Sequence, residues 1–147
     1  MRVADETTTA LGKMAAFIAT FPHYDVLSKL TIDYTDKVPN SGGLFPNGLV
    51  EVSRRRDLLG NVSVTNQYNF ALYATLEKWQ GGEENAEWQM AFQEWVQEQS
   101  AKGLAPTFGD EPRRERLVAQ NGQLFSADEE GTALYVIQIN VTFVKNY

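Results

Sequence analysis

Residues 49–77 read LVEVSRRRDLLGNVSVTNQYNFALYATLE, and this stretch decides the fold. Apolar and polar residues alternate on both sides of residues 58–61 (LLGN), which is the pattern of two β-strands joined by a turn. We predict a hairpin whose first strand ends at Arg56 and whose unusually long second strand covers residues 62–77. Asn66 interrupts the apolar row, so we expect a bulge or a change of exposed face near it.

Downstream of this hairpin, the pattern predicts a helix and further strands. Residues 83–102 carry an apolar stripe at helical spacing, followed by Gly103 in the position of a helix cap. The turn-rich connector APTFGDEP precedes residues 116–127, which predict two short strands around Asn121-Gly122, a strong hairpin signal. Residues 133–145 alternate again and predict a long strand.

Upstream of the hairpin, three shorter segments are expected. Apolar residues at helical spacing predict a helix over residues 5–20, which Pro22 should end. Residues 30–35 alternate and predict a brief strand. Residues 38–48, VPNSGGLFPNG, contain two prolines, three glycines and two asparagines, and we predict a long surface loop there. Loops of this length are often functional.

Together these elements predict the α+β class: one domain over residues 1–147, with an antiparallel sheet, a long hairpin and helices packed on one face. A chain of 147 residues has the length of a single domain. Strands as long as residues 62–77 would overhang such a domain and leave edges that need a partner. Self-association is therefore the first functional expectation.

Composition excludes several classes of protein. The chain has no cysteine, so it can form no disulfide, thiolate metal site or cysteine nucleophile. It carries 13 basic and 19 acidic residues, a net charge of −6, which argues against affinity for nucleic acid. We expect no membrane association, because no apolar run approaches about 20 residues and no basic segment precedes the first apolar stretch.

No catalytic template fits the sequence. Gly43 and Gly48 have the spacing of a phosphate-binding loop, but Leu49 follows where a lysine is required. His23 is the single histidine, so neither a metal site nor a serine triad has its usual partners. The acidic pair at residues 83–84 and the acidic run at residues 128–130 are typical of solvated charge. We therefore predict no enzyme, no catalytic residue, no cofactor and no metal.

Two basic clusters stand out in this acidic chain, at residues 54–56 and at Arg113, Arg114 and Arg116. One interpretation is a guard against edge-to-edge pairing of strands. The other is a charged patch that meets an acidic surface on a neighbouring subunit. Nucleic-acid binding is a weaker alternative, because no aromatic residue is interleaved with these arginines.

Several local strings resemble the tail-terminator, or tail-completion, proteins of long-tailed bacteriophages, and more narrowly the minor capsid type found in prophages of Gram-positive bacteria. The strings are SRRRDLLGNVSVTNQYNFALY, EWQMAFQEWVQEQSAKG, APTFGDEP and YVIQINVTFVKNY, within residues 53–147. The resemblance implies a non-enzymatic virion protein, made in the bacterial cytoplasm, that forms a ring, commonly a hexamer, at the junction of tail and head. Such a ring stops polymerisation of the tail-tube protein and offers a surface to the head connector or stopper protein. DNA passes through its channel without specific binding.

As a hypothesis, we assign ring and tube contacts to the loop at residues 38–48 and to the hairpin. The residues concerned are Leu44, Phe45, Asn47, Arg54, Arg55 and Arg56. The main alternative is another phage neck component, a head-completion protein or connector stopper. A second is a small α+β enzyme or ligand-binding domain with an apolar pocket lined by Tyr68, Tyr73 and Tyr135. A single-stranded nucleic-acid binder is a third.

Overall fold

The computed structural model describes residues 9–24, 29–32, 41–77, 82–127 and 132–147, and the fold belongs to the α+β class as predicted. The elements in chain order are helix α1 (Ala10–Ile18), strands β1 (Lys29–Ile32), β2 (Ser41–Arg56) and β3 (Val62–Glu77), helix α2 (Gly82–Ala101), the short helix η3 (Pro112–Arg114), and strands β4 (Arg116–Ala127) and β5 (Thr132–Asn146).

Five strands form one sheet in the order β1-β2-β3-β5-β4. All neighbours are antiparallel except β1 and β2, which run parallel. The predicted long strand at residues 62–77 is confirmed as β3, and the predicted last strand lies within β5. These two strands pair without interruption from Ser63↔Asn146 to Glu77↔Thr132, so they form the backbone of the sheet.

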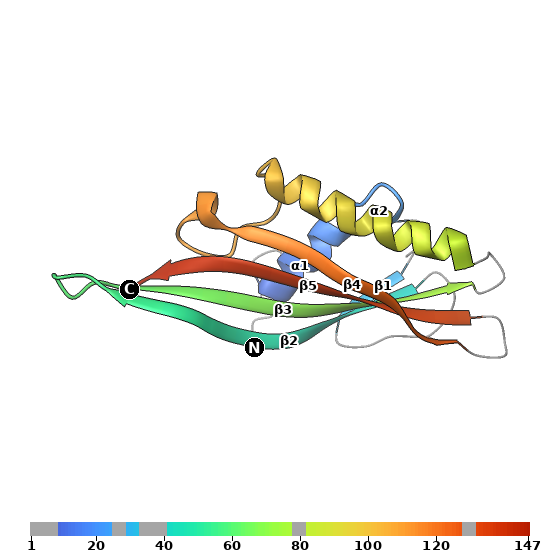
Figure 1. Ribbon diagram of the computed structural model, residues 1–147, viewed down its shortest axis with the longest axis horizontal. Helices are drawn as coiled ribbons and strands as arrows, with labels where there is room; N and C mark the ends of the chain where they lie inside the picture. The colour runs from blue at the N-terminus through green and yellow to red at the C-terminus, as the bar shows by residue number, and fades with distance from the viewer. Residues whose placement is uncertain (1–8, 25–28, 33–40, 78–81, 128–131) are drawn as a thin grey trace, which may run out of the picture.

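Helices α1 and α2 pack against the sheet and share one core with it (Figure 1). Alternate residues of β3 and β5 point into this core, because side chains alternate between the faces of a strand. Phe92 of α2 is fully buried, and the rings of Phe17 and Trp95 stack at 4.6 Å between the two helices. The core includes Met14, Ile18, Phe70, Leu72, Val96, Ile137 and Ile139.

The predicted helices are both present, although the first is shorter than expected. Helix α2 confirms the prediction for residues 83–102. Helix α1 begins after Thr9, whose side chain accepts a hydrogen bond from the backbone N–H of Gly12 at 2.9 Å, and it ends at Ile18, before Pro22. Residues 5–8 and 33–35 of the predicted first helix and first strand lie outside the described residues.

The predicted loop over residues 38–48 is wrong for its described part, because residues 41–48 belong to β2. Residues 41–44 are buried between β1 and β3, and this burial outweighs the local turn propensity of the sequence. Among the described residues, pairing between β1 and β2 runs to Ile32↔Leu44, and Pro46 lies beyond these pairs. A register shift after Pro46 takes up Asn47 and Gly48, and Gly48 adopts a φ of +99° there.

The predicted hairpin at Asn121-Gly122 is also wrong, because β4 continues through it. Gln120 pairs with Gln138 and Gln123 with Val136, so Asn121 and Gly122 together oppose a single residue. Asn121 has a φ of +58°, which is the left-handed conformation that a bulge of this kind requires at its first position. A tight turn needs the same conformation, which is why the local sequence does not distinguish a turn from a bulge.

The bulge expected near Asn66 is present, but it lies in the neighbouring strand. Glu51 pairs with Asn66 and Ser53 with Thr65, so Val52 is the extra residue. β3 itself stays in regular register with β5 at this point.

Candidate functional site

The β2–β3 hairpin projects beyond the helices as a long arm, at the left of Figure 1. We define the arm as residues 49–62, which include the predicted turn at residues 58–61. All of its residues are exposed apart from Val62, which is half-buried. Strand β5 supports the arm from one side, since Val62 and Tyr147 exchange backbone hydrogen bonds of 3.3 and 2.8 Å. The arm is therefore a supported part of the sheet with little of its own surface buried.

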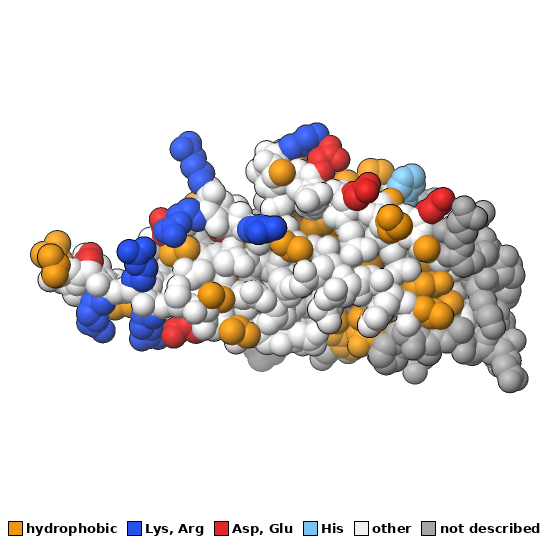
Figure 2. All heavy atoms as spheres, viewed as in Figure 1, with side chains coloured by type: hydrophobic (Ala, Val, Ile, Leu, Met, Phe, Trp, Pro, Cys, Tyr) orange, Lys and Arg blue, Asp and Glu red, His pale blue; other side chains and the backbone are white. Residues whose placement is uncertain are grey.

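Exposed apolar side chains concentrate on the arm. Among the described residues, nine large apolar side chains are exposed, and five of them belong to it: Leu49, Val50, Val52, Leu58 and Leu59. The two leucines form the extreme tip, where Leu58 is fully exposed and Leu59 is 88 % exposed (orange at the left of Figure 2). Exposed apolar side chains gathered on one projecting element of a folded domain are typical of an interaction site.

Asp57 organises the turn that carries these leucines. Its carboxylate accepts hydrogen bonds from the backbone N–H groups of Leu59 and Asn61, both at 2.9 Å, and from the side-chain amide of Asn61 at 3.0 Å. The hydrogen bonds from Asn61 to the carboxylate lower the pKa of Asp57 below its ordinary value. Gly60 completes the turn with a φ of +86°. The tip is thus held in one conformation by its own hydrogen bonds.

The two basic clusters of the sequence meet at the base of the tip. Arg55, Arg56 and Arg114 line one hollow of about 230 Å3, although the two arginine clusters are more than 50 residues apart in the chain. Figure 2 shows lysine and arginine side chains gathered over this end of the molecule. Arg54 donates to Glu51 at 2.7 Å, whereas no described carboxylate forms an ion pair with Arg55 or Arg56. This end of an acidic chain is therefore locally basic.

The six predicted contact residues do not form one surface. Leu44 is fully buried in the core, so it supports the sheet and is removed from the candidate interface. Phe45 is half-buried and packs edge-on against Tyr73 at 5.1 Å, away from the helices. Asn47 is exposed in the bulge of β2, and Arg54, Arg55 and Arg56 are exposed on the arm.

Leu58 and Leu59 were not among the predicted contact residues. A signal was present in the sequence, because two leucines occupy a turn where glycine, asparagine and aspartate usually dominate. Large apolar residues in such a turn have no core to enter, so they stay exposed to solvent.

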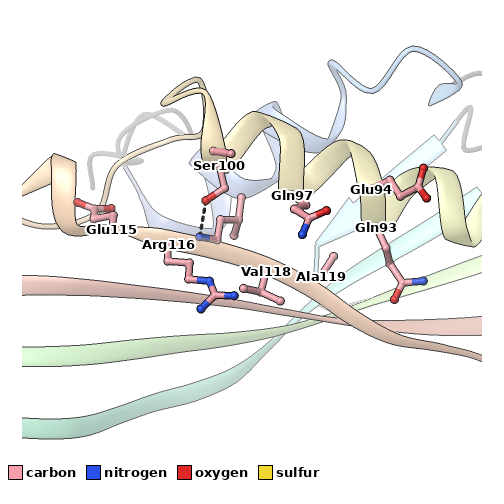
Figure 3. Close-up of a pocket in the computed structure, with 10 residues that line it drawn as sticks. Gln93, Glu94, Gln97, Ser100, Glu115, Arg116, Val118 and Ala119 are labelled. Carbon is pink, nitrogen blue, oxygen red and sulfur yellow. Dashed lines mark hydrogen bonds between the residues drawn. The ribbon is translucent and has the colours of Figure 1, made fainter.

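A second hollow lies between α2 and β4, which is an edge strand of the sheet (Figure 3). We call it the α2–β4 groove; it has a volume of about 590 Å3 and is lined on the β4 side by residues 115–119. Ser100 of α2 spans the two elements, because its hydroxyl oxygen accepts a hydrogen bond from the backbone N–H of Leu117 at 3.0 Å. The α2 side is formed by Gln93, Glu94, Gln97, Ser100 and Ala101.

The three tyrosines of the alternative ligand pocket do not converge. Tyr68 stacks on Phe143 at 4.8 Å, and the hydroxyl of the buried Tyr135 accepts a hydrogen bond from Asn85 at 3.3 Å, both on the helix side of the sheet. Tyr73 points to the opposite face, where it contacts Phe45. A single pocket lined by all three side chains is therefore not formed.

Within the described ranges, no group of three or more histidine and carboxylate side chains converges in a way that could hold a metal ion. His23 is exposed and lies edge-on to the ring of Phe21 at 5.5 Å. Neither α1 nor α2, the two α-helices of the part described, combines the length and apolar character needed to cross a membrane.

No model of a known protein family matches this chain, and no curated protein matches it in sequence.

Proposed function

We propose that this chain is a structural virion protein of the phage tail-terminator kind, which forms a ring at the head-proximal end of the tail tube. The ring stops polymerisation of the tube and joins the tail to the head. The observation that carries this proposal is the projecting arm, whose tip exposes Leu58 and Leu59 beside Arg55 and Arg56, with which no described carboxylate forms an ion pair.

An arm of this kind suits head-to-tail assembly. A closed ring of identical subunits uses two different surfaces of each subunit, one on each side of the contact. The arm differs in shape and charge from the body of the domain. Helix α2 contains five glutamates and no lysine or arginine, so the arm and α2 carry opposite local charges. Opposite charges favour contacts between unlike surfaces and disfavour contacts between like ones.

The face of the sheet away from the helices suits a passage for DNA. Gln67, Asn69, Asn140 and Thr142 are half-buried there and Gln138 is exposed, in cross-strand register between β3 and β5. These side chains are polar but uncharged, so they offer phosphate groups no cation to bind. Affinity for DNA depends largely on phosphate neutralisation by lysine and arginine. This uncharged row would let DNA slide past, and Arg116 of β4, which pairs with Thr142, adds a cation to the same face.

The proposal implies three partners: further copies of this chain, commonly five in a hexamer, the tail-tube protein, and a connector or stopper protein of the head. It places the protein in the virion at the tail–head junction, after synthesis in the bacterial cytoplasm. It requires no catalytic residue, cofactor or metal.

Sedimentation velocity over a concentration series, with negative-stain images of the fastest species, tests the proposal. We expect an oligomer with an open centre that grows with concentration. Mixing with tail-tube protein then separates a terminator, which caps one tube end and limits tube length, from a stopper, which leaves tube length unchanged. A monomer at every concentration would contradict the ring.

A further inference from the structure

We propose that the arm of one copy of this chain docks in the α2–β4 groove of a neighbouring copy. This inference rests on the proposed ring and names the two surfaces that meet in it. The leucines of the tip would cover the apolar part of the groove. Arg55 and Arg56 would face the carboxylates of α2.

The groove is a half-open hollow with a volume of about 590 Å3, which leaves room for an apolar side chain of the tip. Ala101 and Ala119 contribute apolar lining. Leu117 is already buried in the core, and Val118 pairs with Asn140 on the face away from the helices. Leu58 is fully exposed and Leu59 almost fully exposed. Burying them there would remove from water the two most exposed large apolar side chains of the described residues.

The groove also borders the edge of β4, where side chains of α2 already accept hydrogen bonds from two outward backbone N–H groups. The backbone N–H of Leu117 points away from β5 and donates to Ser100 of α2 at 3.0 Å, and that of Gly122 donates to Gln93 at 3.5 Å. Along an antiparallel strand every second N–H points to the same side, so that of Ala119 also points outward. No described side chain accepts a hydrogen bond from it. A backbone carbonyl oxygen of an arriving arm can accept this one hydrogen bond.

The charges of the two surfaces are complementary. Glu94 lines the groove, and Glu87 and Glu94 are exposed on α2, which has no basic residue of its own. Arg116 is the one cation among the described residues that line the groove. The other acidic lining residue, Glu115, is engaged locally, because its two carboxylate oxygens accept the backbone N–H groups of Phe108 and Gly109 at 2.8 and 2.9 Å. Among the lining residues, Glu94 is therefore the carboxylate that can face Arg55 or Arg56 of an incoming arm, and Arg116 is a like charge beside it.

Contacts between like surfaces are disfavoured by the same charges. Two tips meeting each other would bring two sets of Arg55 and Arg56 together, with no described carboxylate paired to either residue. Two grooves meeting would bring two α2 helices and their glutamates together. Like charges placed across an interface cost free energy, so the arm-to-groove combination is the favourable one.

Cysteine crosslinking tests this contact directly, because the chain contains no native cysteine. Leu59→Cys at the tip and Gln97→Cys at the groove are prepared as separate single variants, one with an affinity tag that changes its size. They are mixed and oxidised with copper–phenanthroline. We expect the mixed disulfide dimer to be the main product, since each thiol would lie against its counterpart on the neighbouring copy.

The matched control pairs Leu59→Cys with Gln138→Cys, which places an exposed thiol on the opposite face of the sheet. This mixture should give little mixed product. Tip-to-tip dimers of Leu59→Cys as the main product would overturn the inference. Rings in sedimentation without the mixed disulfide would overturn it while leaving the proposed function standing. Absence of any oligomer would overturn both.

Discussion

Asp57 and Asn61 close the tip of the arm with a reciprocal set of hydrogen bonds. The backbone N–H of Asp57 donates to the carbonyl oxygen of Asn61 at 2.9 Å. The backbone and side-chain N–H groups of Asn61 donate back to the two carboxylate oxygens of Asp57, at 2.9 and 3.0 Å. This closure presents Leu58 and Leu59 to solvent in a fixed geometry. Because the turn is already ordered, less conformational entropy would be lost when a partner binds it.

The first prediction concerns the pH dependence of this turn. The hydrogen bonds from Asn61 lower the pKa of Asp57, so the ionised carboxylate stabilises the closed turn. That stabilisation is present above the ordinary pKa of an aspartate and is lost as the pH falls through the lowered value. The amide chemical shifts of Leu59 and Asn61, followed by NMR, should titrate together below the ordinary pKa of aspartate. In Asp57→Asn this titration should disappear; its persistence would assign it to another group.

The second prediction concerns the arm arginines. Arg55→Glu/Arg56→Glu should abolish assembly in sedimentation velocity, because it reverses the charge that faces the acidic α2. The thermal unfolding midpoint should stay nearly unchanged, since both side chains are exposed and surface substitutions of this kind shift stability by only about 0.5 kcal/mol. The matched variant Arg55→Lys/Arg56→Lys keeps the charge and should retain most assembly. Full assembly by the charge-reversed protein would remove the arginines from the interface.

The third prediction concerns the apolar tip. Leu58→Ser/Leu59→Ser should weaken assembly, because it removes the apolar surface that a partner would bury, while the monomer unfolds at the same urea concentration as before. Leu104→Ser serves as a control, since Leu104 is 64 % exposed but lies outside the arm. Equal effects of the two changes on assembly would show that the position of the leucines is irrelevant.

The fourth prediction tests the packing of helix on sheet. Phe92 is fully buried and contacts the rings of Phe21, Trp88 and Trp95, so Phe92→Ala should lower the free energy of unfolding by about 3–5 kcal/mol. Urea denaturation monitored by circular dichroism measures this change. Phe92→Leu leaves a smaller cavity than Phe92→Ala and should lower the free energy of unfolding by less. If Phe92→Ala lowered the free energy of unfolding by no more than a surface substitution does, the burial of this ring would be contradicted.

The fifth prediction concerns the bulge in β4. Asn121 has a φ of +58°, which glycine adopts freely and a β-branched residue does not. Both Asn121→Gly and Asn121→Val lose the side-chain hydrogen bond to Gln138, so their comparison isolates the backbone. Asn121→Val should unfold with a free energy about 1–2 kcal/mol lower than Asn121→Gly. Equal stabilities would indicate that the strand can shift its register to avoid the strained conformation.

Alternation and helical spacing predicted the long strand at residues 62–77, the turn at residues 58–61, helix α2 and the last strand, because the apolar pattern of each element is strong and local. The errors occurred at residues 41–48 and at Asn121-Gly122, where glycine and asparagine favour turns. In both places the strand continues through a bulge, because its neighbour pairs with it both before and after the bulge: β3 pairs with β2, and β5 pairs with β4. Local propensity cannot anticipate that pairing.

By itself, the sequence determined the α+β class, the hairpin, the two arginine clusters and the absence of cysteine. Those features depend on residue type and on spacing along the chain. Only the tertiary structure decided that Leu44 is buried, that Arg114 joins Arg55 and Arg56, and that the tip leucines extend beyond the helices. Each of these depends on which elements the fold brings together or leaves uncovered. Burial and proximity arise from contacts between distant segments, and no local pattern encodes such contacts.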